Sequence, residues 1–425
     1  MLFGNSAADT AAIMTNQPKL DSLRDRIRAV GSSSGEEAGI GGVVVDPLAN
    51  SMTLYWHGQV PSAVQEETRR AATGQGIKVD TLRAAYTESD LNRKSVALMQ
   101  AAAADPALLG GRHIVSAGPQ PDGSGLHVGL DASTAVPRNA EKPSAPAPAT
   151  PSAAVASADV ITTIRGIIGD YPVTIETVSA KPTTNWTGSS SINRNINGPG
   201  LYNMAGGHIH SGSGGGCSTG FAASDSAGHD VVLTAAHCGW DNWYRGDNSS
   251  VGRTTQISYT YDGQAVSGYS YGDVWLGPDY YNWNGAGQYT AEVTGTQSTG
   301  NGDWMCVSGS VTGYTCNMQV YRTGTHHTYD GHTWYSQNDV RDKSPNFRQI
   351  NANGDSGGPV FFPTTGSTVL AKGLISAGLV ESGVGGTTTC TSPAAIGDRV
   401  TCWDIMSYTD IGAITSTLGV TIKHW

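Results

Sequence analysis

Two short segments far apart in the sequence constrain this chain more than any other feature. LTAAHC ends at His237 and Cys238, and NGDSGGPV surrounds Ser356. A serine is a weak nucleophile until a histidine takes its proton and backbone donors hold the oxyanion that develops. A fold that uses both segments must bring His237 and Ser356 together, and the pair indicates a site for acyl transfer.

The glycines around Ser356 support this interpretation. Gly354, Gly357 and Gly358 leave out side chains where the backbone must turn sharply and where a substrate carbonyl must approach. The N–H groups of Gly354 and Ser356 can point toward one position. We expect these two groups to form an oxyanion hole.

An acid should orient the histidine, and we expect that acid to be Asp273. In YSYGDVWLG it follows a polar turn and begins an apolar run, a pattern that holds a carboxylate at the end of a strand. Three other acids lie in loops rich in Gly, Tyr and Asn without such a run, namely Asp262, Asp279 and Asp303.

At these residues the chain resembles the trypsin-like serine endopeptidases, whose histidine and serine signatures are LTAAHC and GDSGGP. GGHIHSGSGGGCSTGF (206–221) and MCVSGSVTGYTC (305–316) are similar to the secreted bacterial branch that contains the streptogrisins and alpha-lytic protease. The order of His237, Asp273 and Ser356 is that of chymotrypsin-type enzymes. The resemblance extends from about residue 200 to the end, and implies two perpendicular six-stranded antiparallel β-barrels with the site between them.

Composition after residue 200 agrees with an all-β body. Short runs such as VVLTAA and AKGLISAGLV are separated by clusters of Gly, Asn and Asp. Residues 201–425 contain 17 Asp and Glu against 9 Lys and Arg. An acidic surface argues against nucleic acid or an anionic membrane as partner.

All six cysteines lie in this half, which suggests disulfides and an oxidising compartment. Zinc is the alternative, but no Cys-x-x-Cys occurs, and we expect no metal or other cofactor. Sequence alone leaves the connectivity open. The family resemblance implies the pairs Cys217–Cys238 and Cys306–Cys316, which leaves Cys390–Cys402.

The resemblance also indicates where the residue before the cleaved bond is recognised. The expected specificity pocket consists of Ile350, Ser376, Ala377, Gly378 and Met406. Cleavage after Lys or Arg would need a carboxylate at the pocket floor, because a buried unpaired cation is heavily penalised. The segment from Phe347 to Asn353 contains no acid, and Asp404 is the one acid nearby that could reach the floor. We therefore expect Leu, Met or Phe before the scissile bond.

Two departures from the bacterial branch stand near the nucleophile. No cysteine precedes the serine motif, so the pocket wall must be braced in another way. Val307 stands where the branch often has an arginine that pairs with the acid beside the nucleophile. The partner of Asp355 is therefore open.

The first half of the chain is a different kind of polypeptide. Residues 1–131 predict a small α+β domain, with strands in GGVVVDPLANSMTLYW, a helix that begins with Ser62 as its cap, and a helix from Thr87 to Ala104. Residues 132–158 are an Ala/Pro/Ser-rich linker, 159–200 the end of this region with the processing segment, and 201–425 the protease domain.

Pieces of the first half also resemble the pro-regions of the bacterial branch. This implies a segment that assists folding and blocks the cleft until it is removed, with processing between about residues 185 and 206. The alternative is an accessory domain that stays attached. The first thirty residues show no signal peptide, although cysteines and family indicate export.

We therefore expect a secreted, monomeric serine endopeptidase made as a zymogen, whose partners are protein or peptide substrates and its own pro-region. The alternative is a catalytically silent barrel that binds extracellular polymers through tryptophans. The tryptophans considered for it are Trp240, Trp243, Trp275, Trp283, Trp304, Trp334 and Trp403.

Overall fold

The structure is a computed structural model, and it describes most of the chain. The described residues are 6–33, 39–131, 158–182, 205–245, 248–276, 290–329, 331–343, 349–364, 367–381, 385–391 and 399–424. The predicted linker, except for Ala158, and most of the predicted processing segment lie outside them. No helix among these residues is long and apolar enough to cross a membrane.

The N-terminal half is built from helices packed on short sheets. Its elements are α1 (Ala7–Ser33), β1 (Ile40–Asp46), β2 (Ser51–Trp56), α2 (Ser62–Gln75), β3 (Lys78–Arg83), α3 (Glu88–Ala104), β4 (Ile114–Pro119), β5 (Leu126–Asp131), α4 (Ala158–Ile168) and β6 (Val173–Pro182). The side chain of Thr87 accepts a hydrogen bond from the N–H of Asp90 at the start of α3, as the sequence predicts. The cap of α2 is Pro61, one residue before the predicted Ser62.

The first barrel follows residue 205. Its strands are β7 (His208–Ser211), β8 (Gly216–Ser218), β9 (Ala222–Ser224), β10 (Asp230–Thr234), β11 (Asn242–Arg245), β12 (Ser250–Ser258) and β13 (Gly263–Ser267), paired in the order β9-β10-β13-β12-β11-β7-β8. β8 and β9 are two halves of one bent strand, because Thr219 donates to Gly207 while Gly220 donates to Leu233. The bend closes a six-stranded ring.

The second barrel closes by strand pairing alone. Its strands are β16 (Trp304–Gly309), β17 (Gly313–Tyr329), β18 (His332–Asp342), β24 (Ile405–Asp410), β21 (Thr368–Glu381) and β20 (Pro359–Pro363). Each is antiparallel to the next in this order, and β20 returns to β16. The predicted fold class, two six-stranded antiparallel barrels preceded by a small α+β region, is confirmed.

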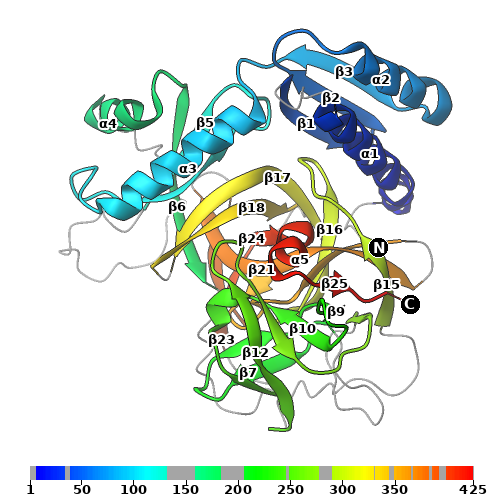
Figure 1. Ribbon diagram of the computed structural model, residues 1–425, viewed down its shortest axis with the longest axis vertical. Helices are drawn as coiled ribbons and strands as arrows, with labels where there is room; N and C mark the ends of the chain where they lie inside the picture. The colour runs from blue at the N-terminus through cyan, green and yellow to red at the C-terminus, as the bar shows by residue number, and fades with distance from the viewer. Residues whose placement is uncertain are drawn as a thin grey trace.

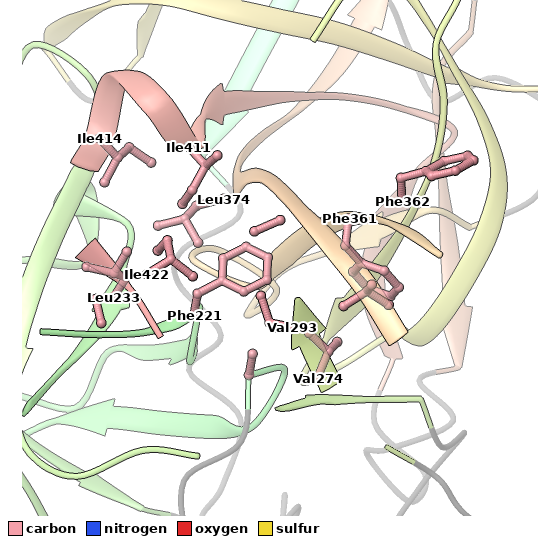
Figure 2. Close-up of a cluster of buried hydrophobic side chains, with 14 of the residues drawn as sticks. Phe221, Leu233, Val274, Val293, Phe361, Phe362, Leu374, Ile411, Ile414 and Ile422 are labelled. Carbon is pink, nitrogen blue, oxygen red and sulfur yellow. The ribbon is translucent and has the colours of Figure 1, made fainter. Parts of the chain in front are cut away.

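Shorter elements complete this half. They are the 3-10 turn η3 (Ala236–Cys238), β14 (Asp273–Trp275), β15 (Thr290–Thr296), β19 (Asn351–Ala352), β22 (Thr387–Thr391), β23 (Arg399–Trp403), α5 (Ile411–Leu418) and β25 (Thr421–Ile422). A single apolar cluster joins both barrels and α5 (Figure 2). Phe221 and Leu233 enter it from the first barrel, Phe361 and Leu374 from the second, and Ile411 from α5.

The N-terminal half adds strands to the second barrel. β17 and β18 form a long hairpin beneath the N-terminal elements (Figure 1). β4 pairs with β17 beyond the barrel, and β5 and β6 extend this sheet. The far end of β6 then pairs antiparallel with β21. The two halves of the chain therefore share one continuous sheet.

Candidate active site

His237 and Ser356 meet as the sequence predicts. His237 lies on the turn that follows β10, and Ser356 lies on the turn between β19 and β20. The imidazole Nε2 of His237 is 2.8 Å from the Oγ of Ser356. This is hydrogen-bond distance for proton transfer between a nucleophile and its base.

The acid beside His237 is Asp262, so the prediction of Asp273 is wrong. The Nδ1 of His237 is 2.9 Å and 2.8 Å from the two carboxylate oxygens of Asp262, which also accepts from the backbone N–H of His237. Asp273 instead starts β14, where it pairs with Glu292. Burial and the charge of Glu292 raise the pKa of Asp273.

Strand register explains why Asp262 reaches the histidine. β13 pairs with β10, with Gln264 opposite Thr234, so the turn before β13 lies beside the residues that lead into His237. Asp262 closes the β12–β13 hairpin with φ +46° and is followed by Gly263. Asp-Gly is a frequent hairpin dipeptide, and this was the sequence signal for its position.

A buried hydrogen-bond network surrounds the carboxylate of Asp262. Its Oδ2 accepts from the Oγ of Ser376 and, at 3.2 Å, from the hydroxyl of Tyr329. Gln337 donates to both hydroxyls. Burial alone would raise the pKa of Asp262, but the charge of His237 and the hydrogen bonds from His237 and Ser376 hold this pKa below its usual value. The acid is therefore kept ionised beside the imidazole.

Ser376 thus belongs to this network, although the sequence analysis placed it in the specificity pocket. Two other expected pocket residues, Ile350 and Met406, pack into the apolar core of the second barrel. Ala377 packs in a cluster with Trp334 and Tyr329, whose rings both lie edge-on to the ring of His237. Of the expected set, this leaves Gly378 as a candidate to face a substrate side chain.

The turn that carries Ser356 is fixed from several sides. The carbonyl of Gly354 accepts from the hydroxyls of Ser218 and Ser310 at 2.8 and 3.0 Å. Gly354 and Gly357 have φ of +98° and +82°, which favours glycine. A Cβ on Gly357 would also lie 2.1 Å from the hydroxyl of Thr234. The expected oxyanion role of Gly354 and Ser356 remains a prediction.

The structure supplies partners for Asp355. One carboxylate oxygen accepts from the N–H groups of Val311 and Thr312 at 2.8 and 3.1 Å, and the other from the Thr312 hydroxyl and the Ala352 N–H at 2.7 and 2.8 Å. Gly309 makes room, since its Cβ would lie 2.1 Å from the carboxylate. Backbone donors therefore take the place of the arginine.

Two of the predicted disulfides are present. Cys217–Cys238 ties the turn of His237 to β8, and Cys306–Cys316 links β16 to β17. Cys402 is disulfide-bonded as well, but the side chain of Cys390 lies outside the described residues, so that pair stays a prediction. The segment before Ser356, where no cysteine occurs, is held by backbone pairing of β19 with β23. Within the described ranges, no group of three His, Cys, Asp or Glu could hold a metal ion.

Over about half of its length, the chain is similar to solved structures of serine proteases. No family model and no curated protein sequence matches the chain. Nocardiopsis protease is 22% identical with a TM-score of 0.37, over 52% of this chain and 98% of its own. A glutamic acid specific serine protease, said to use a histidine triad in substrate binding, is 24% identical with a TM-score of 0.38, over 52% and 100%. A homolog of alpha-lytic protease is 21% identical with a TM-score of 0.36, over 52% and 99%.

Proposed function

We propose that this chain is a serine endopeptidase, secreted and made as a zymogen. The observation that carries the proposal is the continuous relay from Asp262 through His237 to Ser356, on a turn shaped by glycines. Disulfides and the family resemblance support export. The partners proposed are protein or peptide substrates, without a cofactor, and the N-terminal half of the same chain.

The proposed reaction forms and hydrolyses an acyl-enzyme. The Oγ of Ser356 attacks the scissile carbonyl while its proton passes to Nε2 of His237, and the N–H groups of Gly354 and Ser356 hold the oxyanion. His237 then protonates the leaving amine as the C–N bond breaks. Water then attacks the acyl-enzyme and gives its proton to Nε2 of His237, which passes it to the Oγ of Ser356 as the ester C–O bond breaks and the acid is released. Asp262 keeps the proton of the neutral ring on Nδ1 and stabilises the imidazolium.

The N-terminal half is proposed to be an inhibitory pro-region. Its strand β6 runs antiparallel along the edge of β21, with Pro182 opposite Ala377 and Lys181 opposite Gly378. This edge adjoins the nucleophile turn, because the N–H of Gly357 donates to the carbonyl of Ile375 at 2.8 Å and the N–H of Ile375 donates to the carbonyl of Gly358 at 2.9 Å. A substrate strand added to the same edge would compete with β6.

Helix α1 supports a second role for the N-terminal half, in folding. Arg24 and Lys372 both bind Asp303 of the second barrel, at 3.0 and 2.8 Å, and all three are buried. Gln17 exchanges hydrogen bonds with the backbone of Trp304, at 2.9 and 2.7 Å. Burial alone would raise the pKa of Asp303, but the charges of Arg24 and Lys372 lower it to about 2. The pairing of ions across this contact makes the docking of α1 specific.

Residues 200–425 expressed alone should give little active enzyme, and residues 1–200 added in trans should restore it. A barrel of many non-local strand pairs folds slowly and exposes its edges meanwhile. Arg24→Leu leaves the buried carboxylates of Asp21 and Asp303 with one cation fewer. The concentration of residues 1–200 needed for rescue should therefore rise about a hundredfold. Arg70→Leu, on an exposed face of α2, is the matched control. Full activity from the short chain alone would contradict the folding role.

Self-cleavage tests the proposed function directly. The wild-type chain should cleave itself between the N-terminal half and the first barrel, so that two fragments appear on a denaturing gel. Ser356→Ala chain, purified in the same way, should stay intact and should be cut when active enzyme is added. Cleavage of the Ser356→Ala chain in the absence of added enzyme, with a serine-protease inhibitor present, would contradict the proposal.

The alternative of a silent, polymer-binding barrel loses its main support. Of the seven tryptophans considered for it, Trp240 is 60% exposed. Trp283 lies outside the described residues. The others are buried, namely Trp243, Trp275, Trp304, Trp334 and Trp403. Buried rings stabilise strand packing and offer no exposed ring face on which a polymer could stack.

A further inference from the structure

Polar side chains without partners lie beside the turn of Ser356. Asn351 is fully buried, and neither its amide oxygen nor its amide nitrogen has a hydrogen-bond partner among the described residues. The indole N–H of Trp403, 1% exposed, also lacks one there. Asn351 pairs directly with Trp403 across β19 and β23, so the two side chains are neighbours on one face of the sheet. Unpaired buried donors and acceptors are costly, and they favour a ligand that pairs with them.

The indole of Trp403 lies against the strand edge that would bind a substrate. A Cβ built on Gly378 would lie 2.1 to 2.5 Å from Cδ2, Cε2 and Cγ of Trp403. The ring is therefore packed flat on the Gly378 backbone, in the region expected to form the specificity pocket. Its bulk fills space that a Leu or Phe side chain would need.

Charged side chains are disfavoured by the same surroundings. Asp404, the one candidate for a carboxylate on the pocket floor, accepts from the N–H of Gly386 at 2.7 Å and is therefore directed toward β22. An anionic side chain would be buried beside Asn351 and Trp403, which carry no charge. These residues can provide two kinds of hydrogen-bond donor, the indole N–H of Trp403 and the amide N–H groups of Asn351, and one acceptor, the amide oxygen of Asn351.

We propose that the enzyme cleaves after a short, uncharged, hydrogen-bonding residue, the class of Thr, Ser and Asn, and that Trp403 and Asn351 select it. This inference rests on the proposed protease function. It replaces the expectation of Leu, Met or Phe drawn from sequence. A Thr hydroxyl can accept from the indole N–H and donate to the Asn351 oxygen, whereas an apolar side chain leaves both unpaired.

The pairing of β6 supplies a matched peptide. A substrate strand in the register of β6 has Pro opposite Ala377 and its next residue opposite Ser376, beside the nucleophile turn. In this sequence the residue after Pro182 is Thr183. A synthetic peptide with the sequence of residues 178–187 should therefore be cut after the threonine that corresponds to Thr183.

The test compares peptides that differ only at this threonine, replaced by Ser, Asn, Val, Leu, Phe, Lys or Glu. Processed wild-type enzyme should prefer Thr to Val, which has the same shape, by at least tenfold in kcat/KM, and Thr to Phe by about a hundredfold. Trp403→Phe should bring the Thr to Val ratio close to one. Trp403→Ala should raise kcat/KM for the Phe peptide relative to that for the Thr peptide by about a hundredfold. Trp240→Phe, at an exposed site, should change neither ratio.

Ratios measured on one preparation do not depend on how much of a variant folds. A wild-type preference for Leu, Phe, Lys or Glu, or a Thr to Val ratio unchanged in Trp403→Phe, would overturn the proposal. Titration of Ser356 with a fluorophosphonate separates this failure from failure of the protease function. Enzyme that reacts with the probe yet prefers another side chain contradicts the pocket assignment, and protein that never reacts contradicts the function itself.

Discussion

Ser356→Ala and His237→Ala should each lower kcat for peptide hydrolysis on the order of a millionfold. The nucleophile and its base act as one unit, because the Oγ of Ser356 and Nε2 of His237 are 2.8 Å apart and a proton must cross that bond. Removal of both together should therefore cost little more than removal of either. The measurement is kcat on a peptide anilide with enzyme purified in processed form.

Exposed residues of the same types provide the controls. Ser226 and His229 lie in the β9–β10 turn, and replacing either by Ala should leave kcat within about twofold of the wild-type value. If the Ser356→Ala variant retains more than a hundredth of the wild-type rate after contaminating protease has been removed, another residue is the nucleophile.

Asp262→Asn should lower kcat on the order of ten-thousandfold, with Ser356 and His237 still in place. An asparagine amide can donate to Nδ1 of the ring, which stabilises the tautomer whose Nε2 carries a proton and cannot accept one from serine. Asp273→Asn is the matched control and should leave kcat within about twofold, since Asp273 pairs with Glu292 in β14 and β15. The reverse pattern would restore Asp273 as the orienting acid.

The sequence predicted those parts of the site that lie in one continuous segment. His237 and Ser356 stand in motifs whose neighbours, a small turn and a run of glycines, are needed for their own chemistry. Strands and helices such as β1, β2 and α3 were predicted because apolar alternation and the capping threonine Thr87 act within a few residues.

Asp262 was missed because its role depends on strand register. Nothing within its own segment differs from an ordinary hairpin turn, and Asp262 lies beside His237 only when Gln264 pairs with Thr234. Asp273 satisfied a local pattern for a shielded carboxylate but faces another strand. Pairing across a barrel is set by the whole fold and not by the neighbouring residues.

The sequence analysis predicted neither helix α1 nor the role of Trp403 in the proposed pocket, and the reasons are related. α1 contains Pro18 and contacts the second barrel through Arg24, which is buried beside Asp303 and Lys372 from distant segments of the chain. In the proposed pocket, Trp403 reaches Gly378 from β23, and the pairing of β19 with β23 is not marked by any local motif. Side-chain packing between segments decides both.

The most direct measurement of the central claim is the reaction of the processed protein with a fluorophosphonate probe, followed by mass mapping of the labelled residue. Such a probe reacts with a serine only when a base takes its proton and donors hold the oxyanion. The account predicts one adduct, at Ser356, and no measurable labelling of the His237→Ala variant. Labelling at another serine, or equal labelling of the His237→Ala variant, would contradict it.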